Sequence, residues 1–490
     1  MVQIMAERKK TTSARRTRAP RRASSKSPRF TPLKASKITT FNTAVRYLLE
    51  QTDLERARAV KYDQDTFKLD RMAKLLESLG NPEHSVRTAH VAGTVGKGST
   101  VAMISSILQH ADFTVGTYTS PHLTDIRERI AINGHMIEKS AFTATAAQIC
   151  KTAEKQTPDA TYFELLTAMG LQYFAEQAVD IAVVETGLGG RLDATNLTRP
   201  DITLLTLIDY DHMHLLGNDL ESIAAEKAGI MKPGVPVISV PQDPAVEAVL
   251  RAKAEEIGTT IRFIGKEIEF SSRFCVSDDL GPHTRICLIT GRSQYMHLPV
   301  PLPGAHQANN CALALAAIDA IAGETETVDE SIVYRGLADT TIPGRMERVW
   351  QKPAILADGA HNPASLECLM RTVGAHIPND SMICIFGCCQ DKDIDGLLDK
   401  VALGGDKIIF TKASNQPRAA EPEELAKRFA ERHNRVCQVE SQLSAALETA
   451  AQAASRDDLI CITGSFYLVG EAKRHLEQLA AQRDMEMASA

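Results

Sequence analysis

The chain has 490 residues, of which 44% are hydrophobic and 24% are charged. This length predicts two or three domains, and the composition is that of a folded globular protein, which excludes fibrous and wholly disordered classes. No apolar run reaches the length of a membrane-spanning helix, and no apolar core follows the charges near the start of the sequence. We therefore expect a soluble protein without a signal peptide.

Residues 1–37 form a strongly basic segment. They hold twelve of the 55 Lys and Arg residues but one of the 61 acidic residues, Glu7, so the rest of the chain carries a net charge near −17. The segment is also rich in Ser, Thr, Pro and Ala and cannot bury a core, so we predict a disordered tail. Weak nucleic-acid binding and a transit-peptide function are the alternatives that this composition leaves open.

The ten cysteines are scattered along the sequence. The densest group, Cys384, Cys388 and Cys389, lacks the paired C-x2-C spacing of a zinc site. This usage favours reduced thiols in a cytoplasmic protein.

Secondary-structure patterns begin near Phe41. Residues 67–82 ("FKLDRMAKLLESLGNP") place apolar side chains on one helical face and end at Gly80 and Pro82, which predicts an amphipathic helix. Six short apolar runs further along alternate with helical segments and predict strands at residues 180–185, 201–209, 354–358, 382–387, 407–411 and 458–464. Strands buried on both faces and separated by helices are typical of parallel sheets, so we predict an α/β fold.

Turn residues Pro343 and Gly344 mark a candidate domain boundary, because a helical pattern precedes them and a strand follows. We predict a basic disordered tail at 1–37, a first α/β domain at 38–340 and a second α/β domain at 341–490. Residues 278–301 predict a β hairpin late in the first of these domains.

The stretch "HVAGTVGKGST" (residues 90–100) combines glycines, a lysine and hydroxyl side chains where a strand gives way to a helix. Glycines let backbone N–H groups approach phosphate oxygens, the helix N-terminus adds positive potential, and Lys97 can reach the terminal phosphates. The usual G-x4-G-K-[ST] pattern is not matched, because Gly98 directly follows Lys97. An ordinary strand-to-helix turn is the alternative.

Polar residues follow three other predicted strands: Glu185, the pair Asp211 and His212, and Asp358 with His361 and Asn362. Ligands of open α/β sheets bind at the carboxyl ends of strands, so we expect these residues to share one crevice with the loop. A carboxylate, an imidazole and a hydroxyl can complete a Mg²⁺ shell beside nucleotide phosphates. Taken singly, each residue can instead serve as a turn or capping residue.

Several stretches resemble the folylpolyglutamate synthase/dihydrofolate synthase family of the Mur ligase group, in order from about Phe41 to Gly470. They include "HVAGTVGKGST", "GTYTSPHLTDIRERIAING", "TYFELLTAMGLQYF", "VVETGLGGRLDATN", "DHMHLLGNDLESIAAEKAGIMKPGVPVI", "GAHQANN", "PGRMERV", "DGAHNP" and "TGSFYLVGE". The resemblance implies a P-loop-type ATPase domain with a mostly parallel sheet, followed by a smaller Rossmann-like α/β domain.

The resemblance also implies an activity: ATP-dependent ligation of L-glutamate to dihydropteroate, to reduced folates or to both, through an acyl phosphate. It implies Mg²⁺ at two sites and a cytoplasmic monomer, and it leaves a monovalent cation open. Closure of the second domain over the crevice would exclude water from the acyl phosphate.

The resemblance implies site residues by motif. ATP binding falls on Gly93, Thr94, Gly96, Lys97, Gly98, Ser99, Thr100, Asn310, Arg345, Asp358 and His361. Metal binding falls on Ser120, Glu185 and His212. Pterin or folate binding falls on Thr161, Phe163, Glu164, Leu192, Asp193 and Ala194. Catalytic roles fall on Lys97, His212 and Lys227, the last as a carbamate that holds a second metal.

Val95 departs from the family pattern, in which bacterial members carry Asn at this position. The change removes a polar side chain beside the phosphates and bears on nucleotide affinity rather than on reaction class. One alternative is therefore a catalytically impaired nucleotide-binding regulatory protein whose basic tail contacts nucleic acid. A Mur-type peptide ligase is a second alternative, disfavoured because the short basic N-terminus leaves no room for the additional N-terminal domain of those enzymes.

Overall fold

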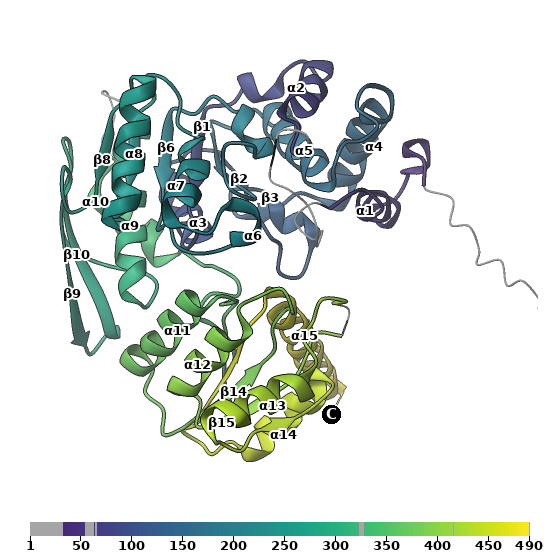
Figure 1. The fold of residues 1–490 in the computed structure, drawn as a ribbon, viewed down its shortest axis with the longest axis vertical. Helices are drawn as coiled ribbons and strands as arrows, with labels where there is room; N and C mark the ends of the chain where they lie inside the picture. Colours follow the sequence, from purple (N-terminus) through teal and green to yellow (C-terminus); the bar gives the residue numbers. More distant parts are fainter. Residues whose placement is uncertain (1–32, 54–62, 64–65, 323–327, 415, 490) are drawn as a thin grey trace, which may run out of the picture.

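The structure is a computed structural model that describes residues 33–53, 63, 66–322, 328–414 and 416–489. It contains two α/β units, one above the other in Figure 1, each built around its own mostly parallel sheet. The predicted α/β fold is confirmed. Among the described helices, none is both long and apolar enough to cross a membrane.

The first unit contains an eight-stranded sheet with the order β4-β3-β2-β5-β1-β6-β7-β8. The six strands from β2 to β8 in this order are parallel, and β3 and β4 add antiparallel pairs at one edge. The strands are β1 (Thr88–Ala92), β2 (Val115–Tyr118), β3 (Ile130–Ile132), β4 (His135–Met136), β5 (Ile181–Glu185), β6 (Ile202–Leu205), β7 (Val237–Ser239) and β8 (Ile261–Phe263). The predicted strand at 201–209 ends earlier, at Leu205, because Leu207 turns to accept hydrogen bonds from the loop after β1.

Helices cover both faces of this sheet. Neighbouring residues of β5, such as Val183 and Val184, are fully buried in different core clusters, as expected for a strand that is packed on both faces. The helices of this unit are α1 (Phe41–Leu49), α2 (Leu69–Ser78), α3 (Lys97–His110), α4 (Lys139–Gln156), α5 (Tyr162–Glu176), α6 (Met213–Leu216), α7 (Leu220–Ala228), α8 (Pro244–Ile257), α9 (Ala305–Ile321) and α10 (Glu330–Ala338). The 3-10 helices are η1 (Ala35–Lys37), η2 (Pro82–His84), η3 (Ile126–Arg129) and η4 (Ala194–Leu197). The helix predicted at 67–82 is α2.

A separate antiparallel sheet lies at the edge of the first unit (Figure 1), with the order β11-β10-β9. The predicted hairpin is confirmed as β10 (Gly281–Ile289) and β11 (Gln294–Pro299). The sequence patterns missed the third strand, β9 (Glu269–Ser277), because most of its side chains are exposed and it lacks an apolar run.

The second unit contains a six-stranded sheet with the order β12-β13-β17-β14-β15-β16, in which β12 alone is antiparallel to its neighbour. Its strands are β12 (Glu347–Trp350), β13 (Ala354–Ala357), β14 (Met382–Phe386), β15 (Lys407–Phe410), β16 (Gln438–Val439) and β17 (Leu459–Thr463). Its helices are α11 (Pro363–His376), α12 (Ile394–Gly404), α13 (Pro422–His433), α14 (Leu443–Ala453) and α15 (Phe466–Ser489). Leu123, from the first unit, inserts into the core between this sheet, α14 and α15.

The described residues begin at 33, within the tail predicted at 1–37. Ala35 is buried and its N–H donates to Glu154, while the Leu33 N–H donates to Glu50. The remainder of the predicted tail, residues 1–32, lies outside the described residues. The exact domain boundaries stay a prediction.

Candidate active site

The loop between β1 and α3 is shaped by two glycines. Gly93 has a φ of 148°, and a Cβ there would lie 1.8 Å from the Thr206 Oγ1 atom. Gly96 has a φ of 98°, and a Cβ there would lie 2.4 Å from the Asn310 Oδ1 atom. Both positions therefore require glycine on conformational and steric grounds. Gly98 has open space by comparison, since its nearest neighbour would be a Glu185 oxygen at 3.8 Å.

Hydrogen bonds fix the rest of this loop. The N–H groups of Thr94 and Val95 donate to the Leu207 carbonyl, and the Thr94 hydroxyl donates to the Asp209 carbonyl. The Thr100 hydroxyl donates to the Gly96 carbonyl in the first turn of α3. The backbone N–H of Val95 therefore helps to fix the conformation of the loop, and this contact does not depend on the side chain at position 95.

Two lysines converge on one carbonyl oxygen. The Nζ atoms of Lys97 and Lys227 donate to the Gly93 carbonyl over 3.2 and 2.9 Å. Lys227 is buried, and burial together with the neighbouring charge of Lys97 lowers its pKa to about 7. A substantial fraction of Lys227 is therefore neutral near neutral pH, in contrast to an ordinary lysine.

Three residues implied for metal binding lie beside these lysines. Glu185 is buried at the end of β5, 3.8 Å from Lys97 Nζ, and accepts a 3.3 Å hydrogen bond from the Ser120 N–H. Burial raises the pKa of Glu185, and Lys97 opposes that shift. His212 has a left-handed backbone, with a φ of 48°, and burial lowers the pKa of its ring to about 4. Ser120 and His212 line one cavity of about 150 Å³.

These residues fit a Mg²⁺ ion bound together with phosphates. No group of three or more His, Cys, Asp or Glu that could hold a metal occurs within the described residues. The protein instead offers one carboxylate, one imidazole and one hydroxyl. The other positions of a six-coordinate shell are left to phosphate and water oxygens. A neutral imidazole and a buried, under-solvated carboxylate are the donor types that such a cation stabilises.

The second unit contributes charged groups to the same cavity. Lys392 lies 3.2 Å from Asp211, and His361 lies 4.0 Å from that carboxylate. Burial would raise the pKa of Asp211, but His212, Lys392 and His361 together hold it below its ordinary value. Burial lowers the pKa of His361 to about 4, so this ring is neutral near neutral pH. The pair Asp211–Lys392 therefore links the two units across the cleft.

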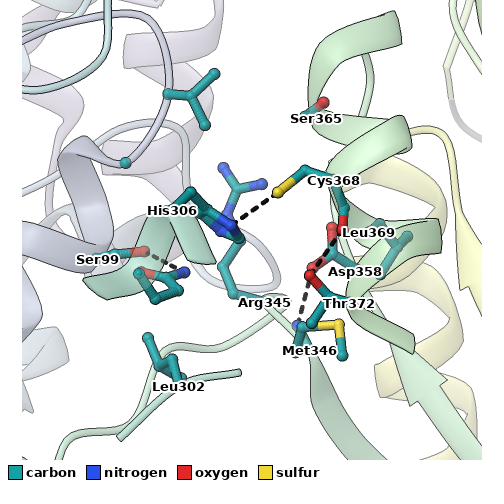
Figure 2. Close-up of a pocket in the computed structure, with 13 residues that line it drawn as sticks. Ser99, Leu302, His306, Arg345, Met346, Asp358, Ser365, Cys368, Leu369 and Thr372 are labelled. Carbon is teal, nitrogen blue, oxygen red and sulfur yellow. Dashed lines mark hydrogen bonds between the residues drawn. The ribbon is translucent and has the colours of Figure 1, made fainter. Parts of the chain in front are cut away.

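A second cavity lies between the phosphate loop and α11 (Figure 2). Arg345 and Asp358 line it from the second unit, facing Gly96 and Ser99 of the loop. The Arg345 guanidinium lies 4.6 Å from the centroid of the Phe466 ring. Asp358 accepts from the backbone N–H groups of Met346 and Ala360, and burial raises its pKa while Arg345 opposes this shift.

Two predicted residues near this second cavity have local structural functions. Asn310 lies against Gly96 and donates to Gln307, which in turn donates to Ser99. Asn362 caps α11 by accepting from the Ser365 N–H, so its side chain is committed to the helix.

All six residues implied for pterin binding line one pocket at the N-terminal ends of α2 and α5. The lining comprises Phe67, Lys68, Leu69, Thr161, Phe163, Glu164, Leu188, Leu192, Asp193 and Ala194, and we call this the acceptor pocket. Phe163 contacts Tyr118 edge-on, with ring centroids 6.0 Å apart. Leu188 lines both the acceptor pocket and the cavity that holds Ser120 and His212, so the two spaces adjoin.

Two residues of the acceptor pocket are already engaged by the protein. Thr161 and Glu164 form a capping box at the start of α5, and Glu164 also forms a 2.8 Å ion pair with Arg71 of α2. The motif "TYFE", which the resemblance assigns to pterin binding, therefore also matches the S/T-x-x-E pattern of a capping box.

Sequence reasoning missed several residues of the site. Lys392 and Arg418 of the second unit line the cavity beside His212, and Arg71 holds Glu164. No strand-end pattern or motif marks Lys392 or Arg418, and the stretch 67–82 that contains Arg71 predicted only a helix. The place of these residues in the site follows from the packing of distant segments.

Comparisons with known proteins match this arrangement. The Mur ligase middle domain family matches residues 91–318, and the Mur ligase glutamate ligase domain family matches residues 344–466. A dihydrofolate synthase/folylpolyglutamate synthase of Bacillus subtilis is 33% identical over 423 residues, covering 84% of this chain and 95% of the relative.

Solved structures give the same result. FolC of Escherichia coli in complex with DHPP and ADP is 30% identical with a TM-score of 0.79, and the alignment covers 92% of this chain and all of that chain. Folylpolyglutamate synthase of Mycobacterium tuberculosis complexed with ADP is 31% identical with a TM-score of 0.79, over 89% of this chain and 98% of that chain. This chain therefore belongs to the folylpolyglutamate synthase/dihydrofolate synthase family, within the Mur ligase group.

Proposed function

We propose that this protein is an ATP-dependent ligase that joins L-glutamate to dihydropteroate, to reduced folates or to both, through an acyl phosphate. The observation that carries the proposal is the convergence of Lys97 and Lys227 on the Gly93 carbonyl, beside Glu185, next to a pocket with an aromatic wall. The names of relatives from Bacillus subtilis and Escherichia coli, dihydrofolate synthase/folylpolyglutamate synthase, support the same reaction.

In this mechanism the loop after β1 binds the phosphates of ATP, and Lys97 contacts the terminal phosphate. Ser120, Glu185 and His212 would hold Mg²⁺, which supplies charge neutralisation on the phosphate oxygens. The acceptor carboxylate attacks the γ-phosphorus in line, and ADP leaves. The amine of L-glutamate then attacks the acyl phosphate, and phosphate leaves as the amide forms. The protein contributes positioning and a preorganised positive field rather than covalent chemistry.

We propose further that Lys227 acts as a carbamate. Its lowered pKa supports this role, because the neutral amine is the form that attacks carbon dioxide. The product would place an anion beside Lys97, which favours a second Mg²⁺ there. The second metal site and a monovalent cation stay predictions, as do a cytoplasmic location and a monomeric state.

Closure of the two units over the cleft is part of the proposal. Lys392 and His361 approach Asp211 from the second unit, so a tighter approach would exclude water from the acyl phosphate. Small-angle scattering should show a more compact protein with an ATP analogue and a folate bound. An unchanged radius of gyration would remove closure from the mechanism.

The decisive experiment is phosphate release by the purified protein with Mg-ATP and L-glutamate, with dihydropteroate and tetrahydrofolate offered separately. Release with dihydropteroate establishes dihydrofolate synthesis, and release with both acceptors establishes a bifunctional enzyme. Release with tetrahydrofolate alone restricts the activity to chain extension. If ATP binds but no phosphate is released with either acceptor, the ligase proposal fails. The regulatory alternative, which rests on the departure from the family pattern at Val95, then gains support.

A further inference from the structure

A chain of buried hydrogen bonds connects β1 to the acceptor pocket. His90 lies in β1, three residues before Gly93, and its Nε2 atom is 2.9 Å from the Thr195 hydroxyl. The Thr195 hydroxyl is 2.5 Å from the Asp193 Oδ1 atom. His90 and Thr195 are fully buried, and Asp193 is 4% exposed. None of the roles in the proposed mechanism uses His90 or Thr195.

The donors in this chain can be assigned from chemistry. Burial raises the pKa of Asp193, but three backbone N–H groups donate to this carboxylate and favour its ionised form. An ionised carboxylate can only accept hydrogen bonds, so the Thr195 hydroxyl donates to Asp193. That hydroxyl is then free to accept, and the His90 Nε2–H is the donor. Burial lowers the pKa of His90 to about 3, with Lys232 adding to the shift, so the ring is neutral. Its single proton lies on Nε2, because this atom donates to the Thr195 hydroxyl. The second ring nitrogen, Nδ1, is buried and has no hydrogen-bond partner among the described residues.

Asp193 is saturated by groups of the protein itself. Its Oδ2 atom accepts from the N–H groups of Gly187 and Leu188 over 2.9 and 2.8 Å. Its Oδ1 atom accepts from the N–H and the hydroxyl of Thr195. Four donors match the lone-pair capacity of a carboxylate. Asp193 therefore holds the segment 187–194 in shape instead of offering a free oxygen to a ligand.

That segment forms one wall of the acceptor pocket. Leu188, Leu192 and Ala194 line the pocket from it, and Phe163 lines the same pocket from α5. Because His90 is part of the strand that leads into the phosphate loop, the hydrogen-bond chain ties this wall to β1, which is paired with a strand on each side. Removal of the Thr195 hydroxyl would leave Asp193 with one donor fewer and His90 without its partner.

We infer that His90 and Thr195 are positioning residues for the acceptor pocket, which fix the wall 187–194 through Asp193 and thereby set affinity for the pterin ring of the acceptor. The inference rests on the proposed assignment of this pocket to the pterin. It predicts an effect on the acceptor and none on ATP, although His90 is nearer in sequence to the phosphate loop than to the pocket.

The test compares Thr195→Val, Thr195→Ser and the control Thr203→Val. Thr203 is also fully buried, lies beside His90 in the neighbouring strand, and has a hydroxyl without a hydrogen-bond partner among the described residues. Thr→Val is nearly isosteric at both positions, so the two variants differ mainly in the hydrogen bond that is lost. Each variant is assayed by phosphate release with the acceptor that the wild type uses, and KM is measured for the acceptor and for ATP.

We expect Thr195→Val to raise the acceptor KM about tenfold, because a hydrogen bond to an ionised group is lost, while the ATP KM stays within about twofold. Thr195→Ser should restore the acceptor KM, and Thr203→Val should match the wild type. His90→Phe, which removes the donor one step further away, should raise the acceptor KM about threefold. Binding of an ATP analogue to each variant verifies that the protein is folded.

Two controls separate this inference from the proposed function. If Phe163→Ala raises the acceptor KM but Thr195→Val does not, the positioning role is wrong and the pocket assignment stands. If Phe163→Ala leaves the acceptor KM unchanged, the pocket assignment itself is wrong. Equal effects of Thr195→Val on both KM values, or the same effects from Thr203→Val, would reduce Thr195 to a general contribution to stability and overturn the inference.

Discussion

The phosphate-loop crevice and the acceptor pocket differ in how the protein satisfies their charged groups. In the crevice, Lys97 and Lys227 share one carbonyl oxygen, and the carboxylate of Glu185 lies 3.8 Å from Lys97, beyond hydrogen-bonding distance. In the acceptor pocket, Glu164 is paired with Arg71 at 2.8 Å, and Asp193 accepts four hydrogen bonds.

This difference has a functional consequence. No carboxylate forms a close hydrogen-bonded pair with Lys97, so the charge of this lysine is incompletely balanced until phosphates bind. The acceptor pocket is balanced without a ligand and is therefore preformed in shape. Substitutions in the crevice should lower kcat, whereas substitutions in the acceptor pocket should raise the KM of the acceptor.

The largest effect is expected for Lys97→Met. The variant loses the cation that contacts the terminal phosphate, and kcat should fall about a thousandfold, as for the loss of a main transition-state donor. Phosphate release under saturating substrates measures this. Lys253→Met, on the surface of α8 where Lys253 pairs with Glu256, is the matched control and should match the wild type. A Lys97→Met variant with a normal kcat and a raised acceptor KM would contradict the division between the two sites.

Lys227→Ala should lower kcat about a hundredfold, the size of effect seen when a group that supports a metal is lost. In buffer purged of carbon dioxide the wild type should lose activity and regain it with bicarbonate. The initial rate of that recovery should rise with pH through about 7, because the lowered pKa of Lys227 makes the amine neutral above this value. Lys227→Arg, which keeps a charge but cannot form the carbamate, should stay inactive with bicarbonate. Activity that does not respond to carbon dioxide would leave Lys227 as a simple cation.

Gly470→Ala tests how the second unit is seated on the first. A Cβ at Gly470 in α15 would lie 2.1 Å from the Leu123 carbonyl oxygen, so the loop between Ser120 and Leu123 must shift. A shift of this kind near the reacting groups should lower kcat/KM about 10- to 100-fold. Gly374→Ala in α11 is the control, because a Cβ there meets nothing within 4 Å. Equal activities of the two variants would show that the Leu123 contact does not position Ser120.

The sequence predicted the fold well because the central strands are buried on both faces and appear as short apolar runs. The same rule placed Glu185 and Asp211 at the carboxyl ends of strands of the first sheet. Asp358 follows a strand of the second sheet and lines the second cavity, so the expected single crevice is divided between the two units. It failed for β9, whose side chains are mostly exposed, and for the end of β6, where Leu207 turns toward the phosphate loop.

The sequence was a weaker guide to contacts between distant segments. The ion pair of Lys392 with Asp211 spans 181 positions, and no local pattern encodes such a distance. Thr161 and Glu164 illustrate the opposite problem, because a motif attributed to ligand binding also forms the N-terminal cap of α5. The same residue types serve both purposes, so only the folded arrangement separates them.

The smallest of these effects, and the sharpest test of the comparison, is expected for Phe163→Ala. The ring lines the acceptor pocket and packs edge-on against Tyr118, so its loss removes a stacking surface without touching a charge. We expect the acceptor KM to rise about tenfold, with kcat and the ATP KM unchanged, because an aromatic contact is worth about that much.

Tyr334→Ala, which removes a half-exposed aromatic ring from α10, is the control and should match the wild type. Phe163→Leu keeps apolar bulk but not the flat face, so an acceptor KM between those of wild type and Phe163→Ala would attribute part of the affinity to stacking. A fall in kcat for Phe163→Ala would instead mean that the acceptor pocket also aligns the carboxylate for attack, so that binding and chemistry are coupled through the Leu188 wall that the two spaces share.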